Sequence, residues 1–230
     1  MDERQEFWEA IRRGESEKVL AFLEKRPRLL EQVNEEGVSP IVFAAYQGHM
    51  DLAERLADRK VVLNIFEAAV CGRVSTLMHL LARDPGLVDA YQGDGFQPLG
   101  LACYFRRFEV VKYLLRAGAP VNSPARNALK ATPLHSAVAA RDTEIVRLLL
   151  SHDAEPNVRE NGGYTPAHIA AQNGDVEILR LLIFYGADTE LKTDEGKTPL
   201  DLALEASHTE VVELLKSGIT KRLRRNFSTT

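Results

Sequence analysis

Short apolar stretches recur along the chain, each followed by a polar break and by a second apolar stretch. In the segment that begins at Thr132, the first stretch is rich in alanine, and the second places Ile145, Val146, Leu148 and Leu149 at helical spacing. Apolar residues spaced in this way share one face of a helix. The pattern therefore predicts pairs of short helices, each with an apolar stripe that one pair cannot bury alone.

The period of the pattern is visible in three segments that align without gaps. They are spaced by 33 residues and read Thr132-Pro133-Leu134-His135, Thr165-Pro166-Ala167-His168 and Thr198-Pro199-Leu200-Asp201. In each segment the Thr hydroxyl can cap free backbone N–H groups, and Pro is favourable at the first position of a helix. Imperfect copies precede them, so we expect seven repeats, which start near residues 5, 39, 63, 97, 132, 165 and 198.

These in-register segments resemble the ankyrin repeat, and the resemblance covers roughly residues 5 to 218. It implies an all-α fold, an α-solenoid of stacked helix-turn-helix repeats with hairpin loops that project to one side. In this family the inner helices and the loop tips form a concave face, which is the usual binding surface. We therefore expect one solenoid domain over residues 1–218 and a basic C-terminal tail over residues 219–230.

Several positions depart from the family pattern. The third repeat starts only 24 residues after the second, which predicts that a hairpin loop is missing between Arg59 and Leu63. In this third repeat, Phe66 falls where later repeats carry histidine. Pro27 and Pro85 stand where the usual Gly-Ala-Asp turn is absent, and both stretches resemble a variant ending that is common in bacterial ankyrin-repeat proteins. A bacterial origin is the corresponding expectation.

Composition and charge narrow the classes of partner. The chain is 45% hydrophobic and 27% charged, and its formal net charge of −4 would be −8 without Lys221, Arg222, Arg224 and Arg225. This acidic body argues against nucleic-acid binding, and the tail is interpreted as a solvated extension, with contact to nucleic acid or membrane, or modification of Ser228, as alternatives. No segment approaches the ~18 apolar residues that span a bilayer. Because the N-terminus is polar and acidic rather than signal-like, we expect a cytoplasmic protein with no membrane partner.

Candidate catalytic and metal-binding residues are few. His135 and His168 occupy the same position in adjacent repeats, and the resemblance implies that each imidazole ties its own loop to the next one. Cys103 aligns with core alanines, whereas Cys71 aligns with Asn173 at a position expected to be exposed. Motifs for phosphate loops and activated nucleophiles are missing from the sequence. We therefore expect no catalytic residue, metal site or cofactor and no enzymatic activity, with an unrecognised active site as the alternative.

Residues that bind a partner are expected at the exposed ends of the inner helices and just before repeat starts. In register, these helix ends read Arg12-Arg13, Tyr46-Gln47, Val70-Cys71, Tyr104-Phe105, Ala139-Ala140, Gln172-Asn173 and Glu205-Ala206. Exposed aromatic side chains are enriched in binding hot spots. The candidate partner-binding residues are therefore the anchors Tyr46, Phe96, Tyr104, Phe105 and Tyr164 and the polar residues Arg12, Arg13, Gln47, Gln172 and Asn173. The alternative is that Phe96 packs under its own loop and Tyr104 covers the adjacent repeat.

The sequence thus favours a protein–protein interaction module, a scaffold that is a monomer on its own and binds another protein on its concave face. Stacked repeats offer a long surface and no enclosed pocket for a small substrate. A regulatory or inhibitory subunit that blocks a single enzyme or toxin is the alternative function, and it would differ by forming one tight stoichiometric complex.

Overall fold

The computed structural model describes residues 3–217 and divides the chain into two compact units, Met1–Pro98 (unit 1) and Leu99–Thr230 (unit 2). Over the described residues the fold is all-α, with fourteen α-helices in seven consecutive pairs and no β-strand. This confirms the predicted α-solenoid architecture of helix-turn-helix repeats. The basic tail predicted for residues 219–230 lies outside the described residues.

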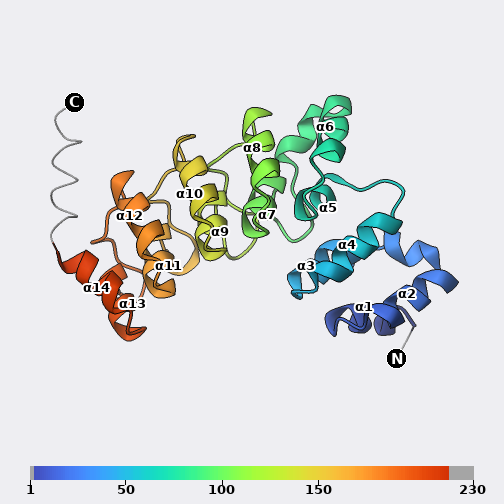
Figure 1. Cartoon of the computed structure of the whole chain (residues 1–230), viewed down its shortest axis with the longest axis horizontal. Helices are drawn as coiled ribbons and strands as arrows, with labels where there is room; N and C mark the ends of the chain where they lie inside the picture. The colour runs from blue at the N-terminus through green and yellow to red at the C-terminus, as the bar shows by residue number, and fades with distance from the viewer. Residues whose placement is uncertain (1–2, 218–230) are drawn as a thin grey trace. The chain divides into compact units, whose positions relative to one another are not determined.

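Unit 1 holds the first three helix pairs. They are α1 (Glu3–Arg12) with α2 (Ser16–Lys25), α3 (Pro40–Tyr46) with α4 (Met50–Arg59), and α5 (Ile65–Val70) with α6 (Val74–Arg83). The first helices of the pairs form one layer, because α1 packs against α3 and α3 against α5 (Figure 1). Pro27 and Pro85 each begin a 3-10 helix, η1 (Pro27–Glu31) and η2 (Pro85–Asp89), where the usual turn is absent.

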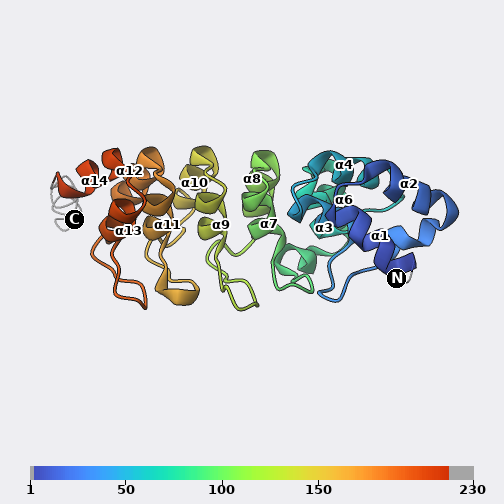
Figure 2. The same ribbon diagram turned by 90° about the horizontal axis from the view of Figure 1, so that it is seen from below.

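Unit 2 holds the other four pairs, apart from Pro98 at the start of α7. They are α7 (Pro98–Tyr104) with α8 (Phe108–Arg116), α9 (Pro133–Ala139) with α10 (Thr143–Leu150), α11 (Pro166–Asn173) with α12 (Val176–Phe184), and α13 (Pro199–Glu205) with α14 (Thr209–Lys216). The inner helices α9, α11 and α13 pack in sequence, and the outer helices α8, α10, α12 and α14 form a second layer. The intervening loops 117–132, 151–165 and 185–198 project to the same side of this unit, and the second contains η3 (Asn161–Gly163) (Figure 2).

The predicted caps form at the inner helices. At the start of α13, the N–H of Thr198 donates to Asp201 Oδ2 at 2.8 Å, and the N–H of Asp201 donates to Thr198 Oγ1 at 3.3 Å. These two bonds satisfy backbone donors that a helix start leaves free. Pro follows the cap at α3, α9, α11 and α13, where its missing N–H costs no hydrogen bond.

The apolar stripe of the outer helices is buried, with one correction. In α10, Ile145, Val146 and Leu149 are fully buried between the two layers, and Leu150 is nearly so. Leu148, which the pattern also placed in the stripe, is only half-buried. The stripe is narrower than predicted because residues 145, 149 and 146, 150 are four apart and superpose on one face, while residue 148 points to its edge.

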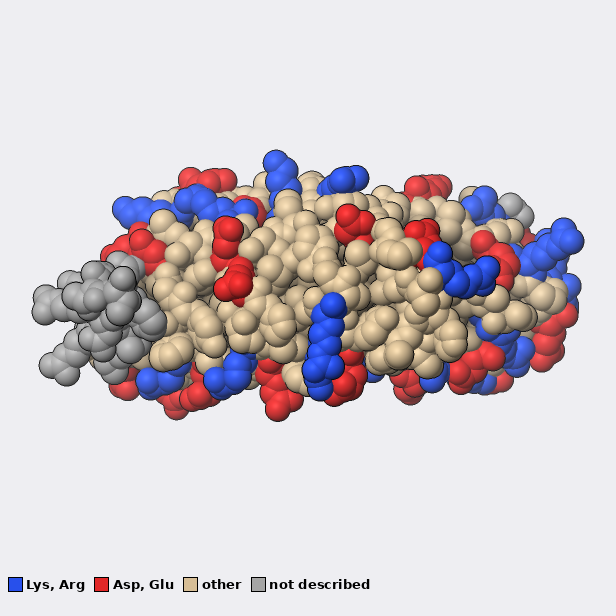
Figure 3. Space-filling model, turned by 90° about the horizontal axis from the view of Figure 1, so that it is seen from above, with Lys and Arg blue, Asp and Glu red and all other residues tan. Residues whose placement is uncertain are grey.

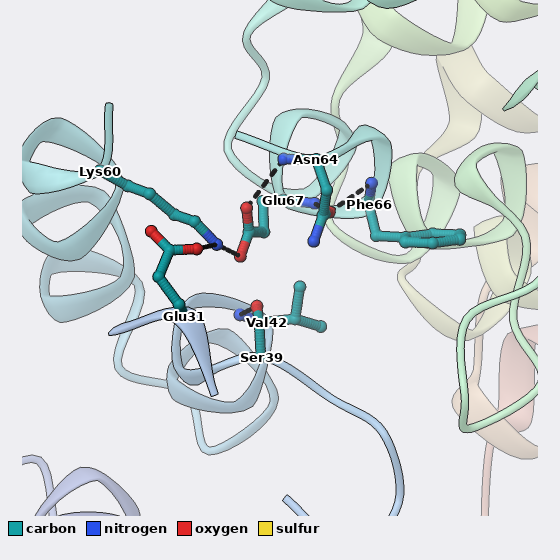
Figure 4. Close-up of polar contacts among 7 residues, drawn as sticks. All are labelled: Glu31, Ser39, Val42, Lys60, Asn64, Phe66 and Glu67. Atoms are coloured by element: carbon teal, nitrogen blue, oxygen red, sulfur yellow. Dashed lines mark hydrogen bonds and ion pairs between the residues drawn. The ribbon is translucent and has the colours of Figure 1, made fainter. Parts of the chain in front are cut away.

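The connection from α4 to α5 lacks a hairpin loop, as the spacing predicts. Lys60 donates to Glu67 Oε1 at 2.9 Å and to Glu31 Oε2 at 3.1 Å, and its side chain is nearly buried (Figure 4). Glu67 is fully buried, and its other oxygen accepts the N–H of Asn64 at 2.9 Å. Asn64 Oδ1 in turn accepts the N–H groups of Phe66 and Glu67.

This arrangement corrects the sequence interpretation of the third repeat. The cap is Asn64 rather than Leu63, so the helix begins one residue later than the repeat frame predicts. The residue three positions after the cap, whose side chain completes the reciprocal cap, is therefore Glu67 and not Phe66. A carboxylate completes the reciprocal cap that imidazoles complete at α9 and α11.

Candidate partner-binding surface

The ends of the inner helices in unit 2 are joined by side chains that reach from one repeat to its neighbour. Arg106 Nε donates to the carbonyl of Ala140 at 2.7 Å, and Arg141 Nε donates to Asp175 Oδ1 at 2.8 Å. His208 Nε2 donates to the carbonyl of Gln172 at 3.0 Å. These bonds align the ends of α7, α9, α11 and α13. We call this row the unit 2 rim, formed by Tyr104, Phe105, Ala139, Ala140, Gln172, Asn173, Glu205 and Ala206.

An aromatic pair stands at the first end of the unit 2 rim. The rings of Tyr104 and Phe105 meet edge to face with their centroids 5.2 Å apart. Tyr104 is 50% exposed and Phe105 is half-buried. Ala139, at the equivalent position of the next repeat, is exposed and ends at its Cβ. Tyr104 and Phe105 are of the residue types that are enriched in binding hot spots.

Gln172 and Asn173 continue the unit 2 rim with amide groups. Gln172 is exposed and Asn173 is half-buried, as expected for helix-end polar residues. The carbonyl of Gln172 is already engaged by His208. Its side-chain amide therefore adds donors and acceptors to the rim without disturbing the contact between repeats.

Tyr164 lies in the loop before α11 rather than on the unit 2 rim. Its ring meets the imidazole of His168 at 5.9 Å, and its carbonyl accepts the N–H of Glu160 at 2.8 Å. Burial raises the pKa of the neighbouring Glu160 carboxyl to about 7. Tyr164 is half-buried, so packing within the hairpin loop already covers part of its side chain.

The imidazoles of His135 and His168, at equivalent positions of adjacent repeats, act as the resemblance implied. His135 Nδ1 accepts the N–H of Thr132 at 3.2 Å, while its Nε2 donates to the carbonyl of Tyr164 at 3.3 Å. His168 repeats this arrangement with Thr165 and the carbonyl of Lys197. Burial lowers the pKa of His135 to about 4 and also lowers that of His168. Both rings therefore stay neutral and tie each loop to the next repeat.

In unit 1, the predicted polar residues Arg12 and Arg13 share one acidic partner. Arg12 and Arg13 both contact the carboxylate of Glu9, at 3.1 and 2.8 Å, and both remain exposed. The guanidinium of Arg12 also lies 5.9 Å from the centroid of the Phe43 ring. These contacts border a groove of about 540 Å³ that Trp8 and Phe43 line. The sequence did not single out Trp8 or Phe43, because both fall inside helix stretches that read as core.

Tyr46 and Phe96 are held near the loop that follows η2. The hydroxyl of Tyr46 donates to Asp94 Oδ2 at 2.7 Å, and the N–H of Phe96 donates to Asp94 Oδ1 at 3.2 Å. Both aromatic side chains are half-buried, whereas Gln47 is exposed. Tyr46 therefore fastens α3 to this loop, which is a structural contact that its position in the repeat did not reveal.

The end of α5 differs from the prediction made from the sequence. Val70 and Cys71 were expected to be exposed, but both are buried. Both side chains are short, and they stand at the end of a helix that packs against α3 and α6. Cys103 is fully buried as predicted, and burial raises the pKa of its thiol well above the ordinary value. A protonated buried thiol is a poor nucleophile.

Residues 3–217 lack two features that would point to other functions. Over residues 3–217, no three His, Cys, Asp or Glu side chains gather as they would around a metal ion. In the same part of the chain, none of the helices has the length and apolar character needed to cross a bilayer.

The outer layer of unit 2 also exposes apolar surface. Figure 3 shows that uncharged residues, polar ones included, make up much of the face drawn there, with a few charged side chains among them. Phe184 at the end of α12 is 51% exposed, nearly the same as Tyr104. Exposure alone therefore does not distinguish the two layers, and Phe184 provides a matched control for Tyr104.

Comparison with known proteins agrees with the fold. Two family models match, ankyrin repeats in three copies over residues 65–160 and ankyrin repeats in many copies over residues 149–203. The chain is 29% identical to Ankyrin repeat and SAM domain-containing protein 6 of Rattus norvegicus over 160 residues, which is 70% of this chain and 15% of that protein. It is 31% identical to the Mus musculus protein of that name over 148 residues, 64% of this chain and 14% of the relative.

A shorter match is to Regulatory protein NPR5 of Arabidopsis thaliana, 53% identical over 58 residues, 25% of this chain and 12% of that protein. The chain therefore spans less than a fifth of the length of these relatives. Together, the repeat frame, the helix pairs, the reciprocal caps and the matched models have one explanation. The chain belongs to the ankyrin-repeat family.

Proposed function

We propose that this protein binds a partner protein through the unit 2 rim, with Tyr104 as the principal anchor. Ankyrin repeats are generally protein–protein interaction modules. The observation that carries the proposal is the half-exposed Tyr104–Phe105 pair beside the exposed Ala139 of the next repeat. An aromatic ring that is already held by a neighbour buries a large area on binding at a small entropic cost.

The other candidate residues supply the remaining contacts in this proposal. Gln172 and Asn173 form the polar continuation of the rim, and Tyr164 contributes from the hairpin loop. Arg12, Arg13, Tyr46, Gln47 and Phe96 provide contacts on unit 1. The polar groups around an aromatic anchor chiefly exclude water and set specificity, so their individual substitutions are expected to weaken binding less.

The test is a site-specific photo-crosslinking experiment in lysate of the source organism. A benzophenone amino acid is placed at position 139 on the rim or, as control, at position 184 on the outer layer. We expect one protein band to crosslink from position 139 and to disappear when Tyr104→Ala is added. Phe184→Ala is the matched substitution, because Phe184 has nearly the same exposure, and it should leave that band unchanged.

Crosslinking of the same protein from position 184, or a band from position 139 that survives Tyr104→Ala, would place the interface elsewhere. A single partner recovered in equal amount would favour the alternative role, a subunit that regulates or inhibits one enzyme or toxin. Several partners at lower occupancy would favour a scaffold. We further propose that the chain is a monomer on its own, resides in the cytoplasm, has no enzymatic activity and does not bind nucleic acid, given its net charge of −4.

A further inference from the structure

The site of the missing hairpin loop in unit 1 exposes two adjacent valines. Val61 is 97% exposed and Val62 is 68% exposed, in the connection between α4 and α5. Isolated exposed apolar residues are ordinary, but contiguous ones beside a hollow mark interaction sites. Here the hollow has a volume of about 370 Å³, and its apolar lining includes both valines, Leu63 and Leu80. We call it the notch.

Polar contacts on both sides of the two valines hold the connection that forms the notch. Lys60 joins the end of α4 to Glu67 on α5 and to Glu31, so the backbone on either side of the valines is fixed (Figure 4). Asn64 caps α5 immediately after the connection. A short connection that is anchored at both ends presents its side chains with little loss of conformational freedom on binding.

All the charged or titratable side chains that line the notch are basic. They are Lys60, Arg73, His79 and Arg83, and no carboxylate is among the lining residues. Lys60 is neutralised by Glu31 and Glu67, and Arg73 by Asp58 at 2.7 Å. Arg83 forms no ion pair within residues 3–217, and it is exposed in the last turn of α6. His79 Nδ1 donates to the carbonyl of Ser75 at 2.8 Å, which leaves Nε2 for a partner.

From this combination we propose that the notch is a second docking site, distinct from the unit 2 rim, for an acidic segment of a partner protein. An aliphatic side chain of that segment packs on Val61 and Val62, and a flanking carboxylate pairs with Arg83. The apolar floor and the unpaired cation of Arg83 beside it complement a segment that carries Leu and a flanking Asp or Glu, and Arg83 repels a segment that carries Lys in that place.

The experiment measures fluorescence anisotropy of short labelled peptides titrated with the full chain. One peptide alternates Glu with Leu, its counterpart alternates Lys with Leu, and a labelled oligouridylate serves as the nucleic-acid probe. We expect the Glu peptide alone to bind, and its affinity to fall roughly tenfold in Val62→Ser and again in Arg83→Glu. Val33→Ser is the matched control, because Val33 is a valine of unit 1 that is 47% exposed and does not line the notch.

Each other outcome overturns the proposal. No binding of the Glu peptide, equal binding of the Glu and Lys peptides, or the same loss in Val33→Ser as in Val62→Ser would exclude an acidic-segment site here. Binding of oligouridylate in place of the Glu peptide would make the notch a nucleic-acid contact. Val33, Val62 and Arg83 are all exposed, so their substitutions should leave the thermal midpoint unchanged. Circular dichroism verifies that the variants are folded. Tyr104→Ala should not affect this binding, which separates the notch from the proposed rim.

Discussion

At the residue scale, the buried imidazoles of His135 and His168 each join one repeat to the hairpin loop of the next. In His135, Nδ1 accepts from the N–H of Thr132, so it cannot also bear a proton, and Nε2–H is the donor to Tyr164. Protonation would break the bond at Nδ1 and place a charge in the interior, which explains the direction of the pKa change. The resemblance of the Thr-Pro-Leu-His segment to the ankyrin repeat implied this tie.

The low pKa of His135 predicts a loss of stability in acid. The pKa falls from 6.5 in the unfolded chain to about 4 in the folded one, so the stabilisation is complete above pH 6.5 and is lost as the pH falls toward 4. The change amounts to about 3 kcal/mol. Urea unfolding followed from pH 7 to pH 4 should show it, and His135→Gln should flatten the dependence.

Glu160 acts in the opposite direction and must be removed for a clean measurement. Its folded pKa of about 7 lies above the ordinary 4.5, so ionisation between these pH values destabilises the fold. The half-buried position of Glu160 reduces this effect to about 1 kcal/mol. The comparison is therefore best made in a Glu160→Gln background. A pH slope that is identical with and without His135 would contradict the assignment.

At the scale of the element, helix pairs and their order followed from the sequence, while individual boundaries and side-chain roles did not. The period fixed where the inner helices from α3 to α13 begin to within one residue, whereas α1 begins at Glu3, three residues before its expected start. It could not distinguish Leu63 from Asn64 as the cap of α5. That choice depends on Glu67 and Lys60, which meet across the shortened connection and share no motif. Likewise, the burial of Val70 and Cys71 depends on how α5 packs, not on their position in the repeat.

The buried pair of Lys60 and Glu67 predicts strong coupling between the two side chains. Lys60→Met would leave the carboxylate of Glu67 fully buried without its cation, at a cost of about 3 kcal/mol. Adding Glu67→Gln removes that charge and keeps an oxygen for the N–H of Asn64, so the double variant should recover most of the lost stability. A double-mutant cycle from thermal or urea unfolding measures the coupling. Additive effects of the two substitutions would show that the charges are screened from each other.

For the whole molecule, the sequence predicted the repeat frame well and the candidate surface only in part. Tyr104, Phe105 and Gln172 lie at helix ends as the register requires. The ties made by Arg106, Arg141 and His208 were missed, since they join residues 34 to 36 apart through polar side chains without a recognisable motif. The division of the chain at Pro98 was also invisible, because no change of composition marks it.

The frame predicts that one complete repeat can be removed from unit 2. Deletion of residues 165–197 joins Tyr164 to Thr198, so the carbonyl that accepts from His135 again precedes a capped helix start. Arg141 then takes the place of Gly174, and its Cβ crowds the ring of His208, so the tie from His208 to this helix end is lost. We expect a cooperative thermal transition at a lower midpoint, because fewer interfaces remain. Deletion of residues 165–190, which breaks the frame, should abolish cooperativity; equal behaviour of the two deletions would refute the prediction.

Two of the ties between helix ends use different residue pairs, and this difference bears on how the repeats can diverge. A Cβ on Gly14 would lie 2.6 Å from the ring of His49, and one on Gly174 would lie 2.7 Å from that of His208. Where Arg141 stands at the equivalent of these glycines, the next repeat carries Asp175 instead of histidine. Glycine with histidine and arginine with aspartate are thus alternative pairs, each split between two repeats. A duplicated or exchanged repeat inherits only half of each pair, so lasting exchanges are those whose new neighbour supplies the matching half.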